Sequence, residues 1–191
     1  MEQVSHQETE EILRLAKLAL LQAGDFVELG CYKGDTSVLL AKLLKEEKSD
    51  KKLWLYDSFA GLPEKTKEDS STAGDQFKAG ELFVSKREVV DKFRRANLPM
   101  PIIKKAFFED LNPDTDLPQE IAFGFLDGDL YGSIKTSLKL TFPKLSKKGI
   151  IIVHDYNNPE LPGSSRAVDE FLRAHPEFHL TQKYTLAILS R

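Results

Sequence analysis

The sequence contains a single cysteine, Cys31, among its 191 residues. One cysteine excludes a disulfide within the chain and is typical of a protein from a reducing compartment. No apolar run approaches the roughly 20 residues that a membrane-spanning helix needs. The first ten residues are polar and acidic, unlike a signal peptide. We therefore expect a cytoplasmic protein without a membrane partner.

The chain also has no excess of basic residues over acidic ones. Lys and Arg total 27 against 30 Asp and Glu, which gives a formal charge of −3. Binding to phosphate backbones needs a concentrated basic surface, so we do not expect nucleic acid as a partner. The length and the 41% of hydrophobic residues fit one domain, residues 1–191, with a core of its own.

Short apolar runs alternate with helical patterns along the chain, which predicts an α/β fold whose twisted, mostly parallel sheet carries helices on both faces. A Ser85 to Glu88 capping box marks the start of one helix. An amphipathic helix lies within residues 1–24, and an antiparallel hairpin closes the chain at 178–189. The expected strands are 25–30, 53–56, 101–103, 121–126 and 150–153, and the expected helices are 36–46, 85–96, 131–140 and 165–174.

Polar side chains follow four of the five expected strands. Ligands of such sheets bind beyond the carboxyl ends of the strands, so we expect these groups to meet at one edge. The stretches 58–80 and 157–163 are predicted rim loops at this edge, and the first of them is favoured as a cover over an acceptor. The polar residues are Glu28 with Gly30, Asp57 with Ser58, Asp127 with Asp129, and His154 with Asp155.

A glycine-rich turn, Glu28 to Thr36, joins the first expected strand to its helix. It lacks the Gly-x-Gly-x-x-Gly spacing of a dinucleotide site. Gly30 and Gly34 permit close approach of a ligand to the backbone. Glu28 or Asp127 can accept from an ammonium group, while Thr36 and the helix amides can bind a carboxylate. The turn thus suits an amino-acid ligand, although a plain strand-to-helix turn is the alternative.

Two further features suit a nucleoside. Asp57 ends the second strand, where a carboxylate can accept both ribose hydroxyls. Phe107 and Phe108 follow the third strand, where an adenine can lie against an aromatic ring. A solvated helix cap and aromatic core packing are the respective alternatives.

The carboxylates after the fourth and fifth strands predict a divalent cation. Oxygen ligands favour Mg²⁺, Mn²⁺ or Ca²⁺, and an imidazole ligand from His154 shifts the preference toward Mn²⁺. The alternative is that His154 packs at its strand end while Asp155 caps a turn.

The chain resembles the macrocin O-methyltransferase family, whose members methylate sugar hydroxyls of antibiotics and related natural products. The first of the shared motifs is also similar to catechol-type O-methyltransferases. Where the family usually has Asp-Asp-Tyr, this sequence has His154-Asp155-Tyr156. The shared motifs are Glu28-Leu-Gly-Cys-Tyr-Lys-Gly34, Tyr56-Asp-Ser-Phe-Ala-Gly-Leu-Pro63, Phe125-Leu-Asp-Gly-Asp-Leu-Tyr131, Asp155-Tyr156 and Ala167-Val-Asp-Glu-Phe171.

The resemblance implies a Rossmann-like methyltransferase fold with an antiparallel last strand, S-adenosylmethionine as donor and Mg²⁺ or Mn²⁺ as metal. It implies Asp129 as the catalytic base, metal ligands at Asp127, His154 and Asp155, and a homodimer as a possible assembly. The implied cofactor-binding residues are Glu28, Gly30, Cys31, Tyr32, Lys33, Gly34, Thr36, Asp57, Ser58, Phe107, Phe108 and Asp127.

We therefore expect an O-methyltransferase that acts on a hydroxyl of a sugar or another small molecule. Two alternatives remain. The chain could bind the cofactor without transferring its methyl group. Asp127-Gly-Asp129 also matches the Asp-x-Asp pattern by which many glycosyltransferases hold Mn²⁺ and a nucleotide sugar.

Overall fold

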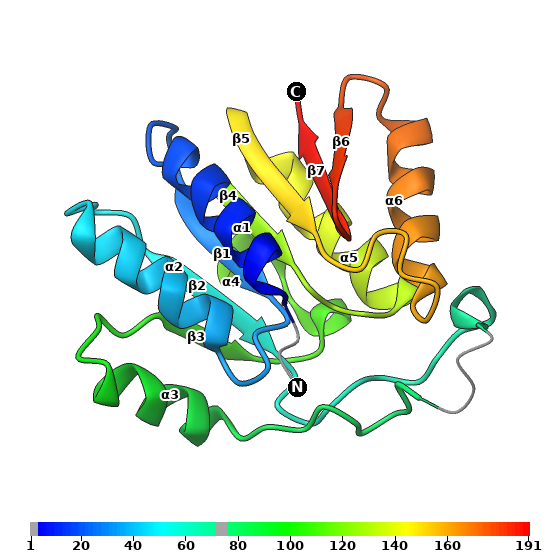
Figure 1. Cartoon of the computed structure of the whole chain (residues 1–191), viewed down its shortest axis with the longest axis horizontal. Coiled ribbons are helices and arrows are strands. Elements are labelled where there is room, and N and C mark those ends of the chain that lie inside the picture. The colour runs from blue at the N-terminus through cyan, green and yellow to red at the C-terminus, as the bar shows by residue number, and fades with distance from the viewer. Residues whose placement is uncertain (1–3, 72–75) are drawn as a thin grey trace.

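A computed structural model describes residues 4–71 and 76–191 of the chain. It contains a seven-stranded sheet in the order β3-β2-β1-β4-β5-β7-β6 (Figure 1). β1 to β5 run parallel, and β7 lies antiparallel between β5 and β6. The predicted α/β class and the antiparallel last strand are confirmed. The strands are β1 Asp25–Leu29, β2 Leu53–Asp57, β3 Ile102–Lys105, β4 Ile121–Leu126, β5 Leu145–Val153, β6 His179–Lys183 and β7 Leu186–Ser190.

Helices cover both faces of the sheet, as the apolar strands require. One buried cluster joins the sheet to α1, α2 and α3, and a second joins its other face to α5 and α6. Neighbouring residues of β1 divide between them, because Phe26 belongs to the first cluster and Val27 to the second. The helices are α1 His6–Ala19, α2 Asp35–Glu46, α3 Lys86–Arg95, α4 Pro113–Asp116, α5 Tyr131–Thr141 and α6 Pro162–Ala174, with 3₁₀ turns η1 Lys67–Asp69, η2 Phe108–Asp110 and η3 Phe142–Lys144.

Local sequence signals explain where the first helices begin. The predicted capping box is present at α3, where the Ser85 side chain accepts from the amide of Glu88. The same motif opens α1, between Ser5 and Glu8. Each box satisfies amides that have no partner within the helix. The expected N-terminal helix is α1, although residues 1–3 of the predicted stretch lie outside the described residues.

Two boundaries differ from the expected ones by three residues or more. β5 begins at Leu145 rather than at 150 because Leu145 and Ser146 are buried, although Lys147 and Lys148 interrupt the apolar pattern between them and the rest of the strand. α6 begins at Pro162 rather than at 165, so the second rim loop is shorter than predicted. Proline suits the first helical position, where its fixed φ fits and no amide is needed.

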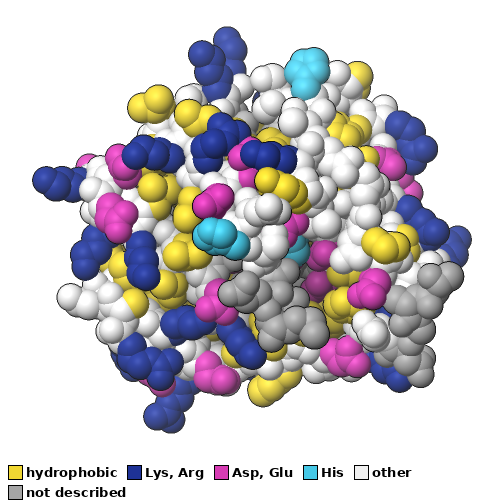
Figure 2. Space-filling view, viewed as in Figure 1, with side chains coloured by type: hydrophobic (Ala, Val, Ile, Leu, Met, Phe, Trp, Pro, Cys, Tyr) yellow, Lys and Arg dark blue, Asp and Glu magenta, His cyan; other side chains and the backbone are white. Residues whose placement is uncertain are grey.

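The first rim loop leaves the end of β2 and crosses below the edge of the sheet toward α6 before it returns to α3 (Figure 1). Residues 72–75 of the predicted stretch lie outside the described residues. In the space-filling view, basic and acidic side chains are interspersed over the face that α1 to α3 form (Figure 2). Among the residues described, no helix is long and apolar enough to cross a membrane.

Candidate active site

The glycine-rich turn after β1 is pressed against the end of β4. Gly30 has a φ of 91°, and a Cβ atom placed on it would lie 1.9 Å from the carbonyl oxygen of Asp127. Its amide donates to the carbonyl of Tyr56 at 2.9 Å, and the amide of Asp127 donates to the carbonyl of Leu29 at 2.8 Å. Only glycine combines this backbone conformation with this close approach. The turn therefore fixes the ends of β1, β2 and β4 relative to one another.

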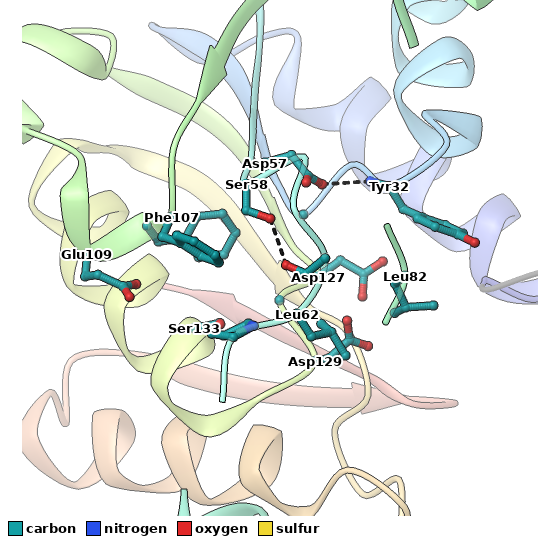
Figure 3. A pocket seen from close by; sticks show the side chains of 15 residues that line it. Tyr32, Asp57, Ser58, Leu62, Leu82, Phe107, Glu109, Asp127, Asp129 and Ser133 are labelled. Carbon is teal, nitrogen blue, oxygen red and sulfur yellow. Dashed lines mark hydrogen bonds between the residues drawn. The ribbon is translucent and has the colours of Figure 1, made fainter. Parts of the chain in front are cut away.

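Asp57 binds the same turn from the end of β2. Its Oδ2 accepts from the amides of Cys31 and Tyr32, each at 3.0 Å, and its Oδ1 accepts from the amide of Phe59 at 2.8 Å (Figure 3). A carboxylate has about four lone-pair sites, so capacity for a further hydroxyl donor remains. Asp57 lines a pocket, which is the position that a ribose-binding carboxylate needs.

This pocket gathers most of the predicted nucleoside residues. Asp57, Ser58 and Phe107 face Asp127 across it (Figure 3). The Ser58 hydroxyl donates to the carbonyl of Gly61 at 2.8 Å and accepts from the amide of Ala60, so it also shapes the local turn. Phe108 is buried in the core, with 8% of its surface exposed, and Phe107 is the more accessible ring for an adenine.

A second cavity, of about 580 Å³, adjoins the first and shares Gly30, Tyr32 and Asp127 with it. Its volume lies within the range of small-molecule sites. Cys31 contributes its backbone amide there, whereas burial, followed by the charge of Asp57, raises the pKa of its thiol, so a reactive thiolate is not favoured. The predicted cofactor residues that line this cavity are Glu28, Gly30, Cys31, Tyr32, Lys33, Thr36 and Asp127.

Glu28 shows what kind of ligand this second cavity fits. Its side chain is 1% exposed, and its Oε2 has no hydrogen-bond partner in the described part of the chain. Burial raises its pKa, and the charges of Asp127 and Asp57 raise it further. A buried carboxylate without a partner is costly, and a cation beside it offsets that cost. The ammonium and sulfonium of S-adenosylmethionine therefore fit a cavity lined by Glu28 and Asp127.

The three predicted metal ligands lie together. Asp127, His154 and Asp155 each place one donor atom within 4.8 Å of the others. His154 Nδ1 lies 2.9 Å from Asp127 Oδ1 and 3.0 Å from Asp155 Oδ2, and its Nε2 lies 3.8 Å from Glu8 Oε2. Burial opposes the charge on the ring, but the three surrounding carboxylates raise the pKa of His154 above its usual value. Two carboxylates and an imidazole fit a divalent ion such as Mn²⁺.

Asp129 stands two residues beyond Asp127, at the edge of the first pocket (Figure 3). Its φ of 59° is uncommon for a residue other than glycine, and Asp155 has a similar φ of 57°. Burial raises the pKa of Asp129, and the charges of Asp127 and Asp155 raise it further. A carboxylate with a raised pKa is a stronger base than an exposed one.

Some residues at the site were not predicted from the sequence. The pocket is also lined by Leu62, Leu82, Glu109 and Ser133. The first of these belongs to the Tyr56–Pro63 motif, and Glu109 directly follows the predicted aromatic pair, so both carried a signal. Glu8 reaches His154 from α1, more than 140 positions away in the chain, and no pattern in the sequence indicates this contact.

A mostly parallel seven-stranded sheet with an antiparallel last strand and helices on both faces is the Rossmann-like fold of methyltransferases. The model of the macrocin O-methyltransferase (TylF) family matches residues 15–180, and the chain belongs to this family.

Named relatives agree with this assignment. The chain is 33% identical to demethyldecarbamoylnovobiocin O-methyltransferase of Streptomyces niveus over 156 residues, which cover 78% of this chain and 58% of that protein. It is 31% identical to the 8-demethyl-8-(2,3-dimethoxy-alpha-L-rhamnosyl)-tetracenomycin-C 4'-O-methyltransferase of Streptomyces olivaceus over 140 residues, 70% of this chain and 53% of that protein. The chain thus spans just over half the length of these curated relatives.

A solved structure agrees with the fold. The O-methyltransferase NovP superposes with a TM-score of 0.82 at 29% sequence identity, over 96% of this chain and 78% of that one. The methyltransferase architecture therefore extends over nearly the whole chain.

Proposed function

We propose that this chain transfers the methyl group of S-adenosylmethionine to a hydroxyl of a sugar or a related small molecule. The observation that carries the proposal is the meeting of Asp57 and Asp127, from the ends of two strands, in one pocket beside a glycine-rich turn. Asp57 binds the ribose, and Phe107 lies against the adenine. Glu28 and Asp127 balance the positive charges of the donor, while Lys33, Gly34 and Thr36 at the start of α2 border its carboxylate.

In the transfer, the acceptor oxygen attacks the sulfonium methyl carbon in line with the carbon–sulfur bond. A carbon–oxygen bond forms, the electron pair of the broken bond goes to sulfur, and S-adenosylhomocysteine leaves. Asp129 takes the proton of the acceptor hydroxyl. The main duty of the protein is alignment of the two reactants, which contributes about 7–11 kcal/mol in well-oriented systems.

Asp127, His154 and Asp155 are the residues that would hold a divalent metal. When bound there, Mg²⁺ or Mn²⁺ supplies Lewis-acid chemistry that acidifies and orients the acceptor hydroxyl. The combination of two carboxylates and one imidazole, rather than any single ligand, supports this part of the proposal. A homodimer, which the family resemblance permits, stays a prediction.

The relatives support a sugar hydroxyl as the acceptor, since one of them is named for a rhamnosyl substrate. We expect the protein to methylate a simple rhamnoside such as p-nitrophenyl α-L-rhamnopyranoside with S-adenosylmethionine, detected as the mass of one added methyl group. We expect EDTA to lower the rate at least about 10-fold and Mn²⁺ to restore it, since a metal-acidified hydroxyl is the better nucleophile.

Each alternative gives a different result. An EDTA-treated enzyme with its full rate would remove the metal from the proposal and leave transfer intact. Binding of S-adenosylhomocysteine without methylation of any hydroxyl compound in a broad library would identify a cofactor-binding protein that does not transfer. Binding of uridine diphosphate in place of S-adenosylhomocysteine would identify the glycosyltransferase that the Asp-x-Asp pattern permits.

A further inference from the structure

The first rim loop places apolar side chains beside Asp129, the proposed general base. We call residues 58–71 and 76–84 the rim segment. Its two arms pair near the pocket, where the amide of Leu62 donates to the carbonyl of Glu81 at 2.8 Å and the amide of Gly80 donates to the carbonyl of Leu62 at 2.9 Å. Leu62 and Leu82 lie on the Asp129 side of the pocket, away from Phe107 and Glu109 (Figure 3). The rim segment thus forms an apolar wall beside Asp129.

One carboxylate anchors the rim segment at a second point. Asp69 is 3% exposed, and its Oδ1 accepts from the amide of Tyr131 at 2.7 Å. Its Oδ2 accepts from both the amide and the hydroxyl of Thr66, each at 2.9 Å. The Tyr131 amide opens α5, where the helix dipole favours a negative charge. Asp69 therefore joins the rim segment to the turn that carries Asp129, two residues before Tyr131.

α6 makes room for this contact through a glycine. A Cβ atom on Gly163 would lie 1.9 Å from Asp69 Oδ1 and 2.7 Å from the amide nitrogen of Tyr131. Glycine is a poorer helix former than alanine, and these short distances explain why glycine stands at this position. Arg166, one turn further along α6, donates to the carbonyl of Glu68. Three elements thus meet at one buried carboxylate.

We propose that Asp69 is a positioning residue for methyl transfer. By tying the rim segment to the first amide of α5, it keeps Leu62 and Leu82 against Asp129, so that the acceptor hydroxyl reacts in a shaped, water-poor space. This inference rests on the proposed function. Displacements of about 1 Å caused by distant substitutions can slow an aligned reaction about 100-fold. In the described part of the chain, Asp69 is hydrogen-bonded to Thr66 and Tyr131, and Asp57 to Cys31, Tyr32 and Phe59, so we expect donor affinity to change little when Asp69 is replaced.

Two substitutions test this role by different routes. Asp69→Asn keeps the shape of the side chain but replaces one acceptor oxygen by a donor. Gly163→Ala places a Cβ atom against both the carboxylate and the Tyr131 amide nitrogen, so it disrupts their contact without changing Asp69. We expect each to lower kcat on the rhamnoside by about 10- to 100-fold, with the dissociation constant of S-adenosylhomocysteine within about threefold of wild type. Hydrogen exchange of the Tyr131 amide is expected to accelerate in both variants.

Matched controls exist for both routes. Glu68→Gln changes a neighbouring carboxylate on the same 3₁₀ turn, and Gly132→Ala adds a methyl group to α5 where no atom lies within 4 Å of the new Cβ. Both are expected to keep wild-type kcat and exchange. Parallel loss of donor affinity and kcat in Asp69→Asn and Gly163→Ala would overturn the proposal, as would faster Tyr131 exchange with unchanged kcat. Failure of the proposed function looks different, because wild type would then transfer no methyl group at all.

Discussion

Replacing Asp129 with asparagine is expected to slow methyl transfer by about 10²- to 10⁴-fold, the usual contribution of a general base. Asparagine has nearly the same shape but cannot accept the acceptor proton. The dissociation constant of S-adenosylhomocysteine is expected to stay within about threefold, since Asp57 and Glu28, the residues proposed to bind the donor, are unchanged. Burial and the charges of Asp127 and Asp155 raise the pKa of the native carboxyl, and this environment makes Asp129 the strongest candidate for the base.

Single-turnover methylation of the rhamnoside, together with calorimetric titration of S-adenosylhomocysteine, checks this result. Asp114→Asn is a suitable control because Asp114 is exposed on α4 and does not line either cavity. Near-wild-type turnover by Asp129→Asn, with intact donor binding, would remove Asp129 as the base. Turnover and donor affinity that fall together would point to damage of the pocket instead.

Replacing Gly30 with alanine is expected to abolish measurable donor binding, with at least about a 100-fold loss of affinity. The new Cβ would lie 1.9 Å from the carbonyl oxygen of Asp127, and the φ of 91° is strained for any residue with a side chain. Strain of this kind costs about 1–3 kcal/mol before the backbone moves. Relief of the clash shifts the turn away from Asp127, and the donor contacts on both sides of it are lost together.

Gly124→Ala is the matched control for this substitution. It adds the same methyl group to β4, where the new Cβ meets Ile151 and Val27 at an ordinary 3.5 Å. Thermal unfolding and titration of S-adenosylhomocysteine are measured for both variants. We expect a lower Tm and lost binding in Gly30→Ala, and near-wild-type values in Gly124→Ala. Wild-type affinity in Gly30→Ala would show that the close approach of β1 and β4 is not needed by the donor site.

The parallel sheet could be predicted from the sequence because the central strands are continuous apolar runs. Such runs are typical of strands that are buried on both faces. β4 matches its predicted range, 121–126, in full. β5 was predicted too short, because Lys147 and Lys148 are exposed while the residues before them are buried. The apolar run from Ile150 therefore revealed only the part of β5 that follows the two lysines.

The part of the candidate site that lies at the ends of the parallel strands was predictable from the sequence. Asp57, Asp127 and His154 follow parallel strands, and parallel strands end at one edge. Glu8 and Asp69 were not predictable, because each reaches the site through long-range packing. Glu8 is the N3 residue of the α1 capping box, and this local role already explains a glutamate there. Asp69 belongs to a 3₁₀ turn in a polar loop. The contacts of Glu8 and Asp69 depend on how α1 and the rim segment pack against the folded sheet.

Titration of the wild-type protein with S-adenosylhomocysteine in a calorimeter tests the central claim most directly. If the strand-end carboxylates form a nucleoside pocket, the titration gives saturable heat with one molecule bound per chain. That heat persists in Asp129→Asn and disappears in Gly30→Ala. A wild-type protein that gives no saturable heat with the demethylated donor would contradict the account.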